Sequence, residues 1–493
     1  MKHTVLLLLL SIFTLACGGK HERTDNRYVK VATVRIPDRE RFTVKGVVVD
    51  SKNNPIGSVV VNDGFNFTQT DNNGIYYLKT NLSESRFVSI SVPPAYEIET
   101  DSFIATGFYA PLSRQEKINR RDFVLRKKEK QSDQFMYIVL SDPQVRNETH
   151  LQRFRNESAA DIRETLKRIR TSSPVYAAVV GDIVFDMMDL FDPYKNILKE
   201  TGVDCYFHTI GNHDFNLACN AFSNTEDKAA CYGEQIYESH FGPTDYSVNI
   251  GKIHIVTLKN IDYFKDKKYT ERFTEDQLKW LIKDLSYVLP GSTVFINLHA
   301  PTSNQSDNGE GNTRNRLELM EILKGYKVHI FAGHTHFFEN YEVTPDIYEH
   351  NIGAVCGAWW AGNVNRCGAP NGYLIVNVNG ENISWQYKAT GKDSDYQFRV
   401  YKPDEFISQA GYVVANVWDW DMTYQVKWYE DGILKGEMEQ FADEDQDYIT
   451  MHGKAAGYKT LHLFRAKPAE NTKQVTVEVC NRFEQTFKQT VVL

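Results

Sequence analysis

The stretch Gly211-Asn212-His213-Asp214 decides how the central region of this chain folds. It follows an apolar run, residues 205–210, that is typical of a buried strand. A glycine and an asparagine directly after a strand predict a tight turn at its carboxyl end, where ligands bind in α/β sheets. A histidine between an amide and a carboxylate there is a candidate for metal and proton chemistry. A turn with a hydrogen-bonded histidine is commoner than a metal site. The ends of the other predicted strands therefore decide between the two.

Other predicted strands of the central region also end in metal-binding residue types. Four more apolar runs occupy residues 135–140, 175–180, 294–298 and 328–332, and a short polar motif follows each run. Because all these motifs follow strands, we expect them on the same edge of one sheet. The motif residues are Asp142, Gln144, Asp182, Asn212, His213, His299, His334 and His336.

This set supplies two carboxylates, two side-chain amides and four imidazoles. Those donors suffice for two five- or six-coordinate divalent cations that share a bridging carboxylate. Strands alternate with amphipathic helices in the same region, which predicts an α/β domain. One helix should begin after Thr274, because Gln277 stands at the capping-box position before an apolar face.

Strand-rich patterns flank the central region on both sides. Residues 41–127 combine short β-runs with turn motifs and resemble the carboxypeptidase-regulatory type of β-sandwich. Residues 392–493 alternate clearly and predict a second compact β-domain. The expected order is a signal peptide at 1–16, a tether at 17–40, a β-sandwich at 41–127, an α/β domain at 133–391 and a β-domain at 392–493.

Length and composition indicate a globular protein of several domains. The chain has 493 residues, of which 42% are hydrophobic and 24% charged, and this length suits two or three domains. Its formal net charge of -8 argues against a general nucleic-acid-binding surface, so we expect no nucleic-acid partner.

The first residues have the pattern of a targeting segment. Lys2 and His3 precede a leucine-rich run that is too short to span a bilayer. The run ends in Leu15-Ala16-Cys17-Gly18, which resembles a bacterial lipobox. That resemblance implies cleavage before Cys17, lipidation of Cys17 and anchoring to a membrane of the bacterial cell envelope, facing the periplasm or the exterior. An ordinary secretory signal with a chance cysteine is the alternative.

Export would permit disulfides among the remaining six cysteines. Cys219 with Cys231, and Cys356 with Cys367, are close enough in sequence to close surface loops. Cys205 and Cys480 lie in predicted strands and are expected to be buried thiols. Spacing alone leaves the pairing open.

The order of the central motifs resembles the calcineurin-like metallophosphoesterase family. The motifs are Asp-x-x, Gly-Asp, Gly-Asn-His-Asp, a lone histidine after a strand and Gly-His-x-His, within about residues 136–388. The three-part layout also resembles, more loosely, a family of exported bacterial proteins. The resemblance implies a β-sandwich core flanked by helices. It also implies metal-dependent hydrolysis of phosphomonoesters or phosphodiesters, with a dinuclear centre and a bridging hydroxide.

The same resemblance implies roles for the motif residues. His213 would face the substrate phosphate and protonate the leaving oxygen, and Asp214 would orient His213. Thr335 and Asp186 are expected to support neighbouring residues. The ligands would be Asp142, Gln144 and His336 for the first metal, Asp182 as the bridge, and Asn212, His299 and His334 for the second metal.

Gln144 departs from the family pattern, because many members have histidine at this position. Its amide oxygen is neutral and harder than an imidazole nitrogen, which favours Mn²⁺ or Mg²⁺ over Zn²⁺. We therefore expect two divalent cations among Mn, Mg, Fe and Zn, with Mn favoured. A degenerate protein that binds one metal is the alternative.

Substrate contacts are expected in the loops above this edge. Trp359 and Trp360 could stack on a sugar, a base or a lipid headgroup, or could pack between the central and C-terminal domains. Arg314 could bind a second phosphate, or could belong to a solvated helix start, and the same applies to Arg316. The expected partner is a phosphorylated small molecule or envelope component. The alternative functions are a nucleotide or sugar-nucleotide pyrophosphohydrolase on the same core, and a non-catalytic surface binding module.

Overall fold

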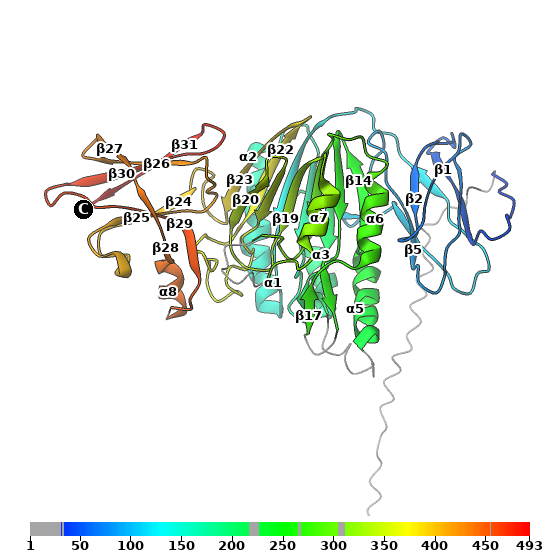
Figure 1. Ribbon diagram of the computed structural model, residues 1–493, viewed down its shortest axis with the longest axis horizontal. Coiled ribbons are helices and arrows are strands. Elements are labelled where there is room, and N and C mark those ends of the chain that lie inside the picture. The colour runs from blue at the N-terminus through cyan, green and yellow to red at the C-terminus, as the bar shows by residue number, and fades with distance from the viewer. Residues whose placement is uncertain (1–30, 32–33, 216–225, 265–267, 304–310, 454) are drawn as a thin grey trace, which may run out of the picture.

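The computed structural model describes residues 31, 34–215, 226–264, 268–303, 311–453 and 455–493. The expected signal peptide and Cys17 lie outside the described residues, as do Cys219 and the side chain of Cys231. Two β-rich regions lie at opposite ends of a central α/β region (Figure 1). Among the described residues, no helix has both the length and the apolar character that crossing a membrane requires.

The N-terminal region consists of two small sheets that pack face to face. The end of the expected tether belongs to this region, because Val31 and Ile36 are buried against β1 and the Val31 amide donates to Asp122. The first sheet contains β10 (Phe123–Leu125), β1 (Val44–Asp50) and β4 (Ile75–Leu78), with β9 (Asn119–Arg120) also paired to β1. The second contains β3 (Phe67–Gln69), β2 (Val60–Asn62), β5 (Phe87–Ile90) and β8 (Tyr109–Pro111).

The central region is built on two facing sheets. The seven-stranded sheet has the order β23-β22-β11-β12-β13-β7-β6, and the six-stranded sheet has the order β14-β15-β18-β19-β21-β20. The first comprises β6 (Thr100–Asp101), β7 (Ile104–Ala105), β11 (Gln134–Leu140), β12 (Val175–Val180), β13 (Cys205–Thr209), β22 (Gly372–Asn379) and β23 (Asn382–Ala389). The second comprises β14 (Tyr246–Ile250), β15 (Ile253–Thr257), β18 (Thr293–Asn297), β19 (Lys327–Ala332), β20 (Glu339–Thr344) and β21 (Ile347–Asn351).

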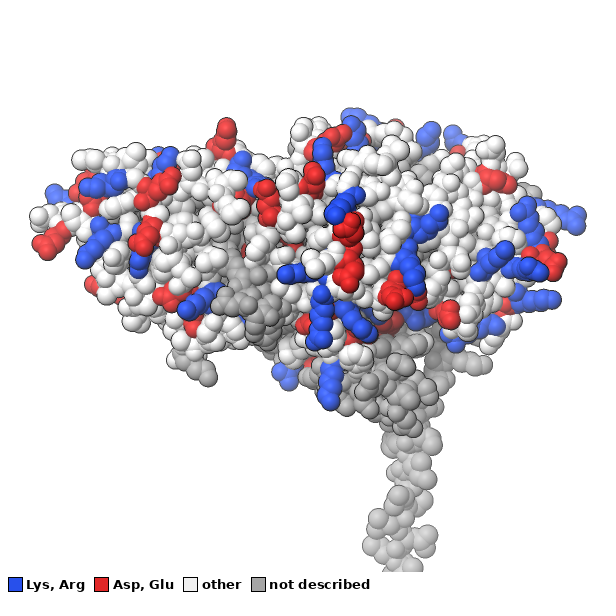
Figure 2. All heavy atoms as spheres, in the orientation of Figure 1, with Lys and Arg blue, Asp and Glu red and all other residues white. Residues whose placement is uncertain are grey.

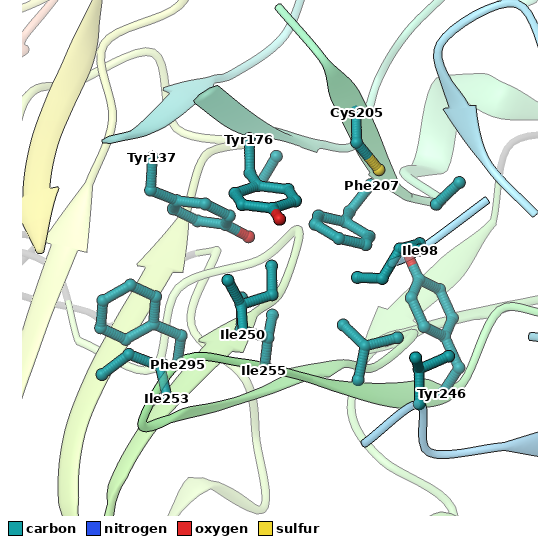
Figure 3. Packing of buried hydrophobic residues seen from close by; sticks show 14 of the residues in the cluster. Ile98, Tyr137, Tyr176, Cys205, Phe207, Tyr246, Ile250, Ile253, Ile255 and Phe295 are labelled. Atoms are coloured by element: carbon teal, nitrogen blue, oxygen red, sulfur yellow. The ribbon is translucent and has the colours of Figure 1, made fainter. Parts of the chain in front are cut away.

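Apolar side chains fill the space between the two sheets. Tyr137 of β11 packs against Phe295 of β18, with ring centroids 5.5 Å apart, and against Phe331 of β19 at 5.8 Å. Figure 3 shows Tyr137 and Tyr176 facing Ile255 and Phe295 across this layer. Strands β11 to β13 are parallel, as are β15, β18 and β19, so the carboxyl ends of the motif strands in each sheet share one edge.

The central sheet arrangement confirms the predicted α/β class with a β-sandwich core. The prediction that all motif residues follow strands of one sheet was wrong, because β18 and β19 belong to the second sheet. The sequence pattern shows which runs are strands, but it does not show which strands pair. The short strand β7, in the region expected to be purely N-terminal sandwich, pairs with β13 at the edge of the first central sheet.

Helices cover the outer faces of both central sheets. On the seven-stranded sheet lie α1 (Glu148–Phe154), a π-helical turn (Arg155–Ala159), α2 (Ala160–Ile169) and α3 (Phe191–Leu198). On the six-stranded sheet lie α6 (Glu275–Leu285) and α7 (Arg316–Leu323). The predicted start of α6 is confirmed, since Thr274 and Gln277 form a capping box. Outside these layers are α5 (Glu226–Phe241) and the hairpin of β16 (Ile261–Tyr263) and β17 (Tyr269–Glu271).

The C-terminal region also contains two sheets, which enclose a core of their own. A single α-helix, α8 (Gln446–His452), interrupts the predicted β pattern of the described residues there. One sheet has β24 (Phe398–Tyr401), β25 (Val413–Val417), β29 (Lys459–Ala466) and β28 (Glu439–Glu444); the other has β27 (Ile433–Glu437), β26 (Gln425–Glu430), β30 (Gln474–Cys480) and β31 (Thr486–Val492).

Two of the cysteines that could have closed a loop are separate thiols. Cys356 and Cys367 are both buried and free, so the suggested pairing between them was wrong. They face different surroundings: the Cys356 sulfur lies 3.9 Å from Oε1 of Gln144, whereas the Cys367 sulfur accepts the amide hydrogen of Phe338. Cys205 is a buried thiol as expected, whereas Cys480 is only half-buried.

Charged side chains of both signs are interspersed on the face of the molecule that Figure 2 shows. No broad field of positive charge covers that view, which agrees with the formal net charge of -8.

Candidate metal centre

The motif residues sit on strained turns at the strand ends. Asp142, Gln144, Asp182, His334 and His336 all have positive φ angles, between 42° and 70°. Residues other than glycine rarely adopt this conformation, and such positions persist where the surrounding structure holds them, often at functional sites. The strain therefore marks these turns as a site candidate independently of residue type.

Two glycines allow the turns to approach one another closely. A Cβ atom on Gly211 would overlap the backbone nitrogen and Oδ1 of Asp182. A Cβ atom on Gly333 would overlap the hydroxyl oxygen of Ser141 and approach the carboxylate of Asp142. Glycine is therefore required at both positions by the contact between neighbouring turns.

Asp142 and His336 form the first part of the site. Nε2 of His336 lies 3.6 Å from Oδ1 of Asp142, and neither atom has a hydrogen-bond partner among the described residues. Both side chains are buried, at 1% and 0% exposure, and their other polar atoms are bonded, Nδ1 of His336 to the Gly357 carbonyl at 2.6 Å. Buried polar atoms without partners are uncommon and call for a missing group. A carboxylate oxygen and an imidazole nitrogen fit a divalent cation.

The second part of the site is formed by Asn212, His299 and His334 around Asp182. Nε2 of His299 lies 2.9 Å from Oδ1 of Asn212 and 3.2 Å from Nδ1 of His334. It is also 3.3 Å from Oδ1 of Asp182. The ligand atoms of Asp182, His299 and His334 all lie within 4.8 Å of one another, which is compatible with a shared metal ion. Nδ1 of His299 donates to the Val180 carbonyl at 2.9 Å, and this leaves Nε2 for a cation.

Asp182 lies between the two parts. One carboxylate oxygen faces His299, and the other accepts a hydrogen bond from Nε2 of Gln144 at 2.8 Å. Burial disfavours the charged form, yet His299 and His213 hold the pKa of Asp182 well below its usual range. Burial opposes the charge of His299, but Asp182 and Asp142 raise its pKa to about 9. The carboxylate of Asp182 and the imidazole of His299 thus favour each other's charged form.

Gln144 presents its amide nitrogen, not its oxygen, to Asp182. Its Oε1 atom lies on the opposite side, near the sulfur of Cys356. A metal ligand must offer the oxygen, so coordination by Gln144 requires the amide to rotate by half a turn. Such a rotation would leave the oxygen beside Asp182, where both side chains could reach one cation.

His213 adjoins the site, because its backbone amide donates to Oδ1 of Asp182 at 2.8 Å, and 22% of its side chain is exposed. Its Nδ1 atom is 2.9 Å from Oδ1 of Asp186, and its ring stacks on Phe185 with centroids 4.0 Å apart. Burial opposes the charge, but Asp182 and Asp186 together raise the pKa of His213 above its ordinary value. A protonated, partly exposed imidazole at this place can donate a proton to a bound group.

The expected role of Asp214 was wrong. Its two carboxylate oxygens accept the amide hydrogens of Gly211, at 2.8 Å, and of Val184, at 3.1 Å. Burial and the charge of Asp182 raise the pKa of Asp214 to about 8. Asp214 therefore closes the turn, and the carboxylate that holds His213 is Asp186. Adjacency in sequence favoured Asp214, but the turn directs its side chain toward the backbone.

The three residues suggested for substrate binding differ in their surroundings. Trp360 is 7% exposed, and its ring nitrogen donates to the Pro143 carbonyl at 2.9 Å, so this residue packs inside the central region. Trp359 is 40% exposed and stacks on His336, with centroids 4.7 Å apart. The Arg314 side chain is exposed. Arg316 instead donates to the Thr302 carbonyl at 2.7 Å, which ties it to the structure.

Glu271 is a site residue that the sequence motifs did not reveal. Its Oε1 atom lies 3.5 Å from Nε2 of His334, on the side opposite His299. A carboxylate on the far nitrogen of a metal-binding histidine fixes the orientation and tautomer of the ring. Glu271 ends the short polar strand β17, which carries no apolar strand signal, so no pattern pointed to it.

Three family models match successive parts of the chain. Residues 42–128 match the N terminal of Calcineurin-like phosphoesterase, and residues 135–338 match Calcineurin-like phosphoesterase. Residues 349–487 match the C terminal of Calcineurin-like phosphoesterase. A comparison with curated proteins found no match.

Solved structures resemble the chain at low similarity. A dimetal phosphatase from Danio rerio is 14% identical, with 52% of this chain and 97% of that chain covered and a TM-score of 0.36. A purple acid phosphatase from yellow lupin (Lupinus luteus) seeds is 13% identical, with 52% of each chain covered and a TM-score of 0.37. A 5'-nucleotidase from Candida albicans is 14% identical, with 52% and 51% covered and a TM-score of 0.33. The chain spans about half the length of the last two.

Proposed function

Because this chain belongs to the calcineurin-like phosphoesterases, hydrolases that act on phosphoester bonds, we propose that it cleaves its substrate with two divalent cations. The observation that carries the proposal is a pair of buried atoms, Oδ1 of Asp142 and Nε2 of His336, that have no hydrogen-bond partner in the described part of the chain. They lie next to the cluster of Asp182, His299 and His334. One cluster would account for one cation, and the unpartnered pair supports a second.

The residues divide into two ligand groups around Asp182. Asp142, His336 and a rotated Gln144 would hold the first cation, and Asn212, His299 and His334 the second. The amide ligand at the first position supports Mn²⁺ over Zn²⁺ there. When bound, such a cation pair neutralises a phosphate and lowers the pKa of water so that an oxygen nucleophile forms near neutral pH.

His213 supplies the proton that the leaving oxygen needs. Its side chain is partly exposed beside Asp182, and Asp186 holds Nδ1. That hydrogen bond leaves Nε2 for the substrate and favours the protonated form of the ring. General-acid assistance of this kind is worth about 10²–10⁴-fold in rate.

The substrate is a phosphomonoester or a phosphodiester in this proposal. A nucleotide or sugar-nucleotide pyrophosphohydrolase on the same core is the closest alternative, since the ligand groups would serve either bond. The other alternative is a protein that is not an enzyme, namely a non-catalytic binding module. The pairing of the partly exposed His213 with Asp186 favours catalysis, because a merely structural histidine does not need a carboxylate partner at such a position.

A phosphoester panel with the Mn²⁺-loaded protein tests the proposal. We expect turnover of p-nitrophenyl phosphate or bis-p-nitrophenyl phosphate that chelation abolishes and Mn²⁺ restores. His213→Ala should lower kcat by at least about 100-fold with metal content unchanged. Faster cleavage of a nucleotide diphosphosugar than of either ester would favour the pyrophosphohydrolase. Absence of metal-dependent turnover on all three would contradict catalysis.

We further propose export and lipid anchoring at Cys17, which rest on the sequence motif alone. Expression with labelled palmitate should give a labelled membrane fraction that Cys17→Ser loses. An unlabelled, freely soluble product would contradict the anchor.

A further inference from the structure

Three aromatic side chains surround the proposed metal centre, each packed against one imidazole. They come from three separate segments: the loop after β12, strand β17 and the loop after β21. We call these three residues the aromatic collar. The ring pairs are Phe185 with His213 at 4.0 Å, Trp359 with His336 at 4.7 Å, and Tyr269 with His334 at 6.0 Å between centroids.

Trp359 is the most exposed member of the collar, and the backbone is strained to hold it there. It is 40% exposed, and it has a φ of 55°, followed by 60° at Trp360. Large side chains seldom adopt this conformation, and two in succession need strong support. Trp360 supplies that support, because its carbonyl accepts from Arg153 at 2.7 Å and its ring nitrogen donates to Pro143. The buried tryptophan thus anchors the exposed one.

Arginines lie close to two members of the collar. The guanidinium carbon of Arg146 is 5.5 Å from the Phe185 ring, and that of Arg366 is 5.8 Å from the Trp359 ring. Arg366 also lies 3.4 Å from the ring of Tyr458 in the C-terminal region. Positive charge beside the rings suits an anionic ester and strengthens contacts with polarisable rings.

We propose that the aromatic collar selects phosphoesters whose leaving alcohol carries a ring with an apolar face. This inference rests on the proposed phosphoesterase function. Because the collar rings pack against His213, His334 and His336, the alcohol of a phosphate held between the ligand groups would lie beside these rings. An aryl or base ring, or the apolar face of a sugar, can then stack on Trp359. A short open-chain alcohol offers no face to stack.

Three primary alkyl esters of similar leaving-group strength provide the test: benzyl phosphate, glucose 6-phosphate and glycerol 3-phosphate, each also as a methyl diester. We expect at least one ring-bearing ester to exceed the glycerol ester by about 10-fold in kcat/KM. A preference for the benzyl ester identifies an aromatic ring, and a preference for the glucose ester identifies a sugar face. Equal rates for all three would overturn the proposal.

Trp359→Ala should raise KM about 5- to 10-fold more for the preferred ring ester than for the glycerol ester. Trp359→Phe should restore most of the preference. Phe65→Ala is the matched control, because Phe65 is 46% exposed but lies in the N-terminal region. Metal content is measured in each variant, since Trp359 contacts His336. An equal loss on all esters, or no loss on any, would show that the collar only shields the imidazoles.

A binding measurement separates this inference from the proposed function. Calorimetry with benzylphosphonate and propylphosphonate does not require turnover. The Mn²⁺-loaded wild type should bind benzylphosphonate about 10-fold more tightly, and Trp359→Ala should remove that difference. Equal binding of the two probes would overturn the inference even if the esters are hydrolysed. Selective binding without hydrolysis would support ring selection by the collar and contradict the proposed hydrolysis.

Discussion

Nδ1 of His213 lies 2.9 Å from Oδ1 of Asp186, although the two residues follow different strands of the same sheet. The acidic residue next to His213 in the sequence, Asp214, points away from it and bonds to the backbone. The carboxylate that supports the proposed general acid is therefore supplied from the neighbouring turn.

Asp186→Asn is expected to lower kcat by about 10- to 100-fold. Asp186 helps to raise the pKa of His213, so its loss should lower that pKa. A general acid must be protonated, so the alkaline limb of the kcat–pH profile should move to lower pH. An unchanged profile would show that Asp186 does not act through His213.

Asp214→Asn provides the contrast. The pKa of Asp214 is raised to about 8, so the side chain is largely neutral at pH 7 and removing its charge matters little. Asparagine has one acceptor oxygen where the carboxyl group accepts two amide hydrogens, so about 1–3 kcal/mol of stability should be lost. Urea unfolding measures this loss. A reduction of kcat equal to that of Asp186→Asn, with normal stability, would restore the orienting role.

Gln144→His should raise the affinity of the first position for Zn²⁺, because imidazole is a softer ligand than an amide oxygen. Titration calorimetry with Zn²⁺ and Mn²⁺ measures both affinities, and Gln144→Ala serves as the control that offers no ligand. If the histidine and alanine variants bind both metals as the wild type does, Gln144 is not a ligand.

Gly211→Ala should displace Asp182, because the added Cβ atom has no room beside its backbone and carboxylate. We expect loss of most bound metal and of activity. Gly432→Ala is the control for an added methyl group in open space, although Gly432 has a φ of 86° and Gly211 one of -108°. The control should lose about 1–2 kcal/mol of stability, the cost of the left-handed conformation, and keep its metal. Full metal content in Gly211→Ala would contradict the close contact.

Buried histidines should make the fold sensitive to acid. Burial, with a contribution from Lys195, lowers the pKa of His208 to about 3. The neutral His208 side chain contributes fully to stability above the pKa of histidine in the unfolded chain, near 6.5. This contribution decreases as the pH falls from there toward 3. When the pH falls from 7.5 to 5.0, the free energy of unfolding should decrease by about 2 kcal/mol more for the wild type than for His208→Phe. Urea unfolding at both pH values measures the difference. Equal losses would show that His208 takes up its proton in the folded state.

Local patterns predicted the strand ends and the motif residues, because apolar runs and turn residues act over a few positions. The same patterns could not predict that β7 joins the central sheet or that β18 and β19 form a second sheet, since pairing depends on long-range packing. Asp186 and Glu271 were missed as partners of His213 and His334 for the same reason. Trp359 and Trp360 are adjacent and alike in sequence, yet only the fold makes one exposed and the other an anchor.

The most direct measurement of the central claim is the metal stoichiometry of the purified, Mn²⁺-loaded protein. Elemental analysis should give two metal ions per chain for the wild type and one for His336→Ala, which removes a ligand of the first group only. Asp182→Asn should lose most of both. A single ion in the wild type that His336→Ala leaves unchanged would contradict a two-metal centre.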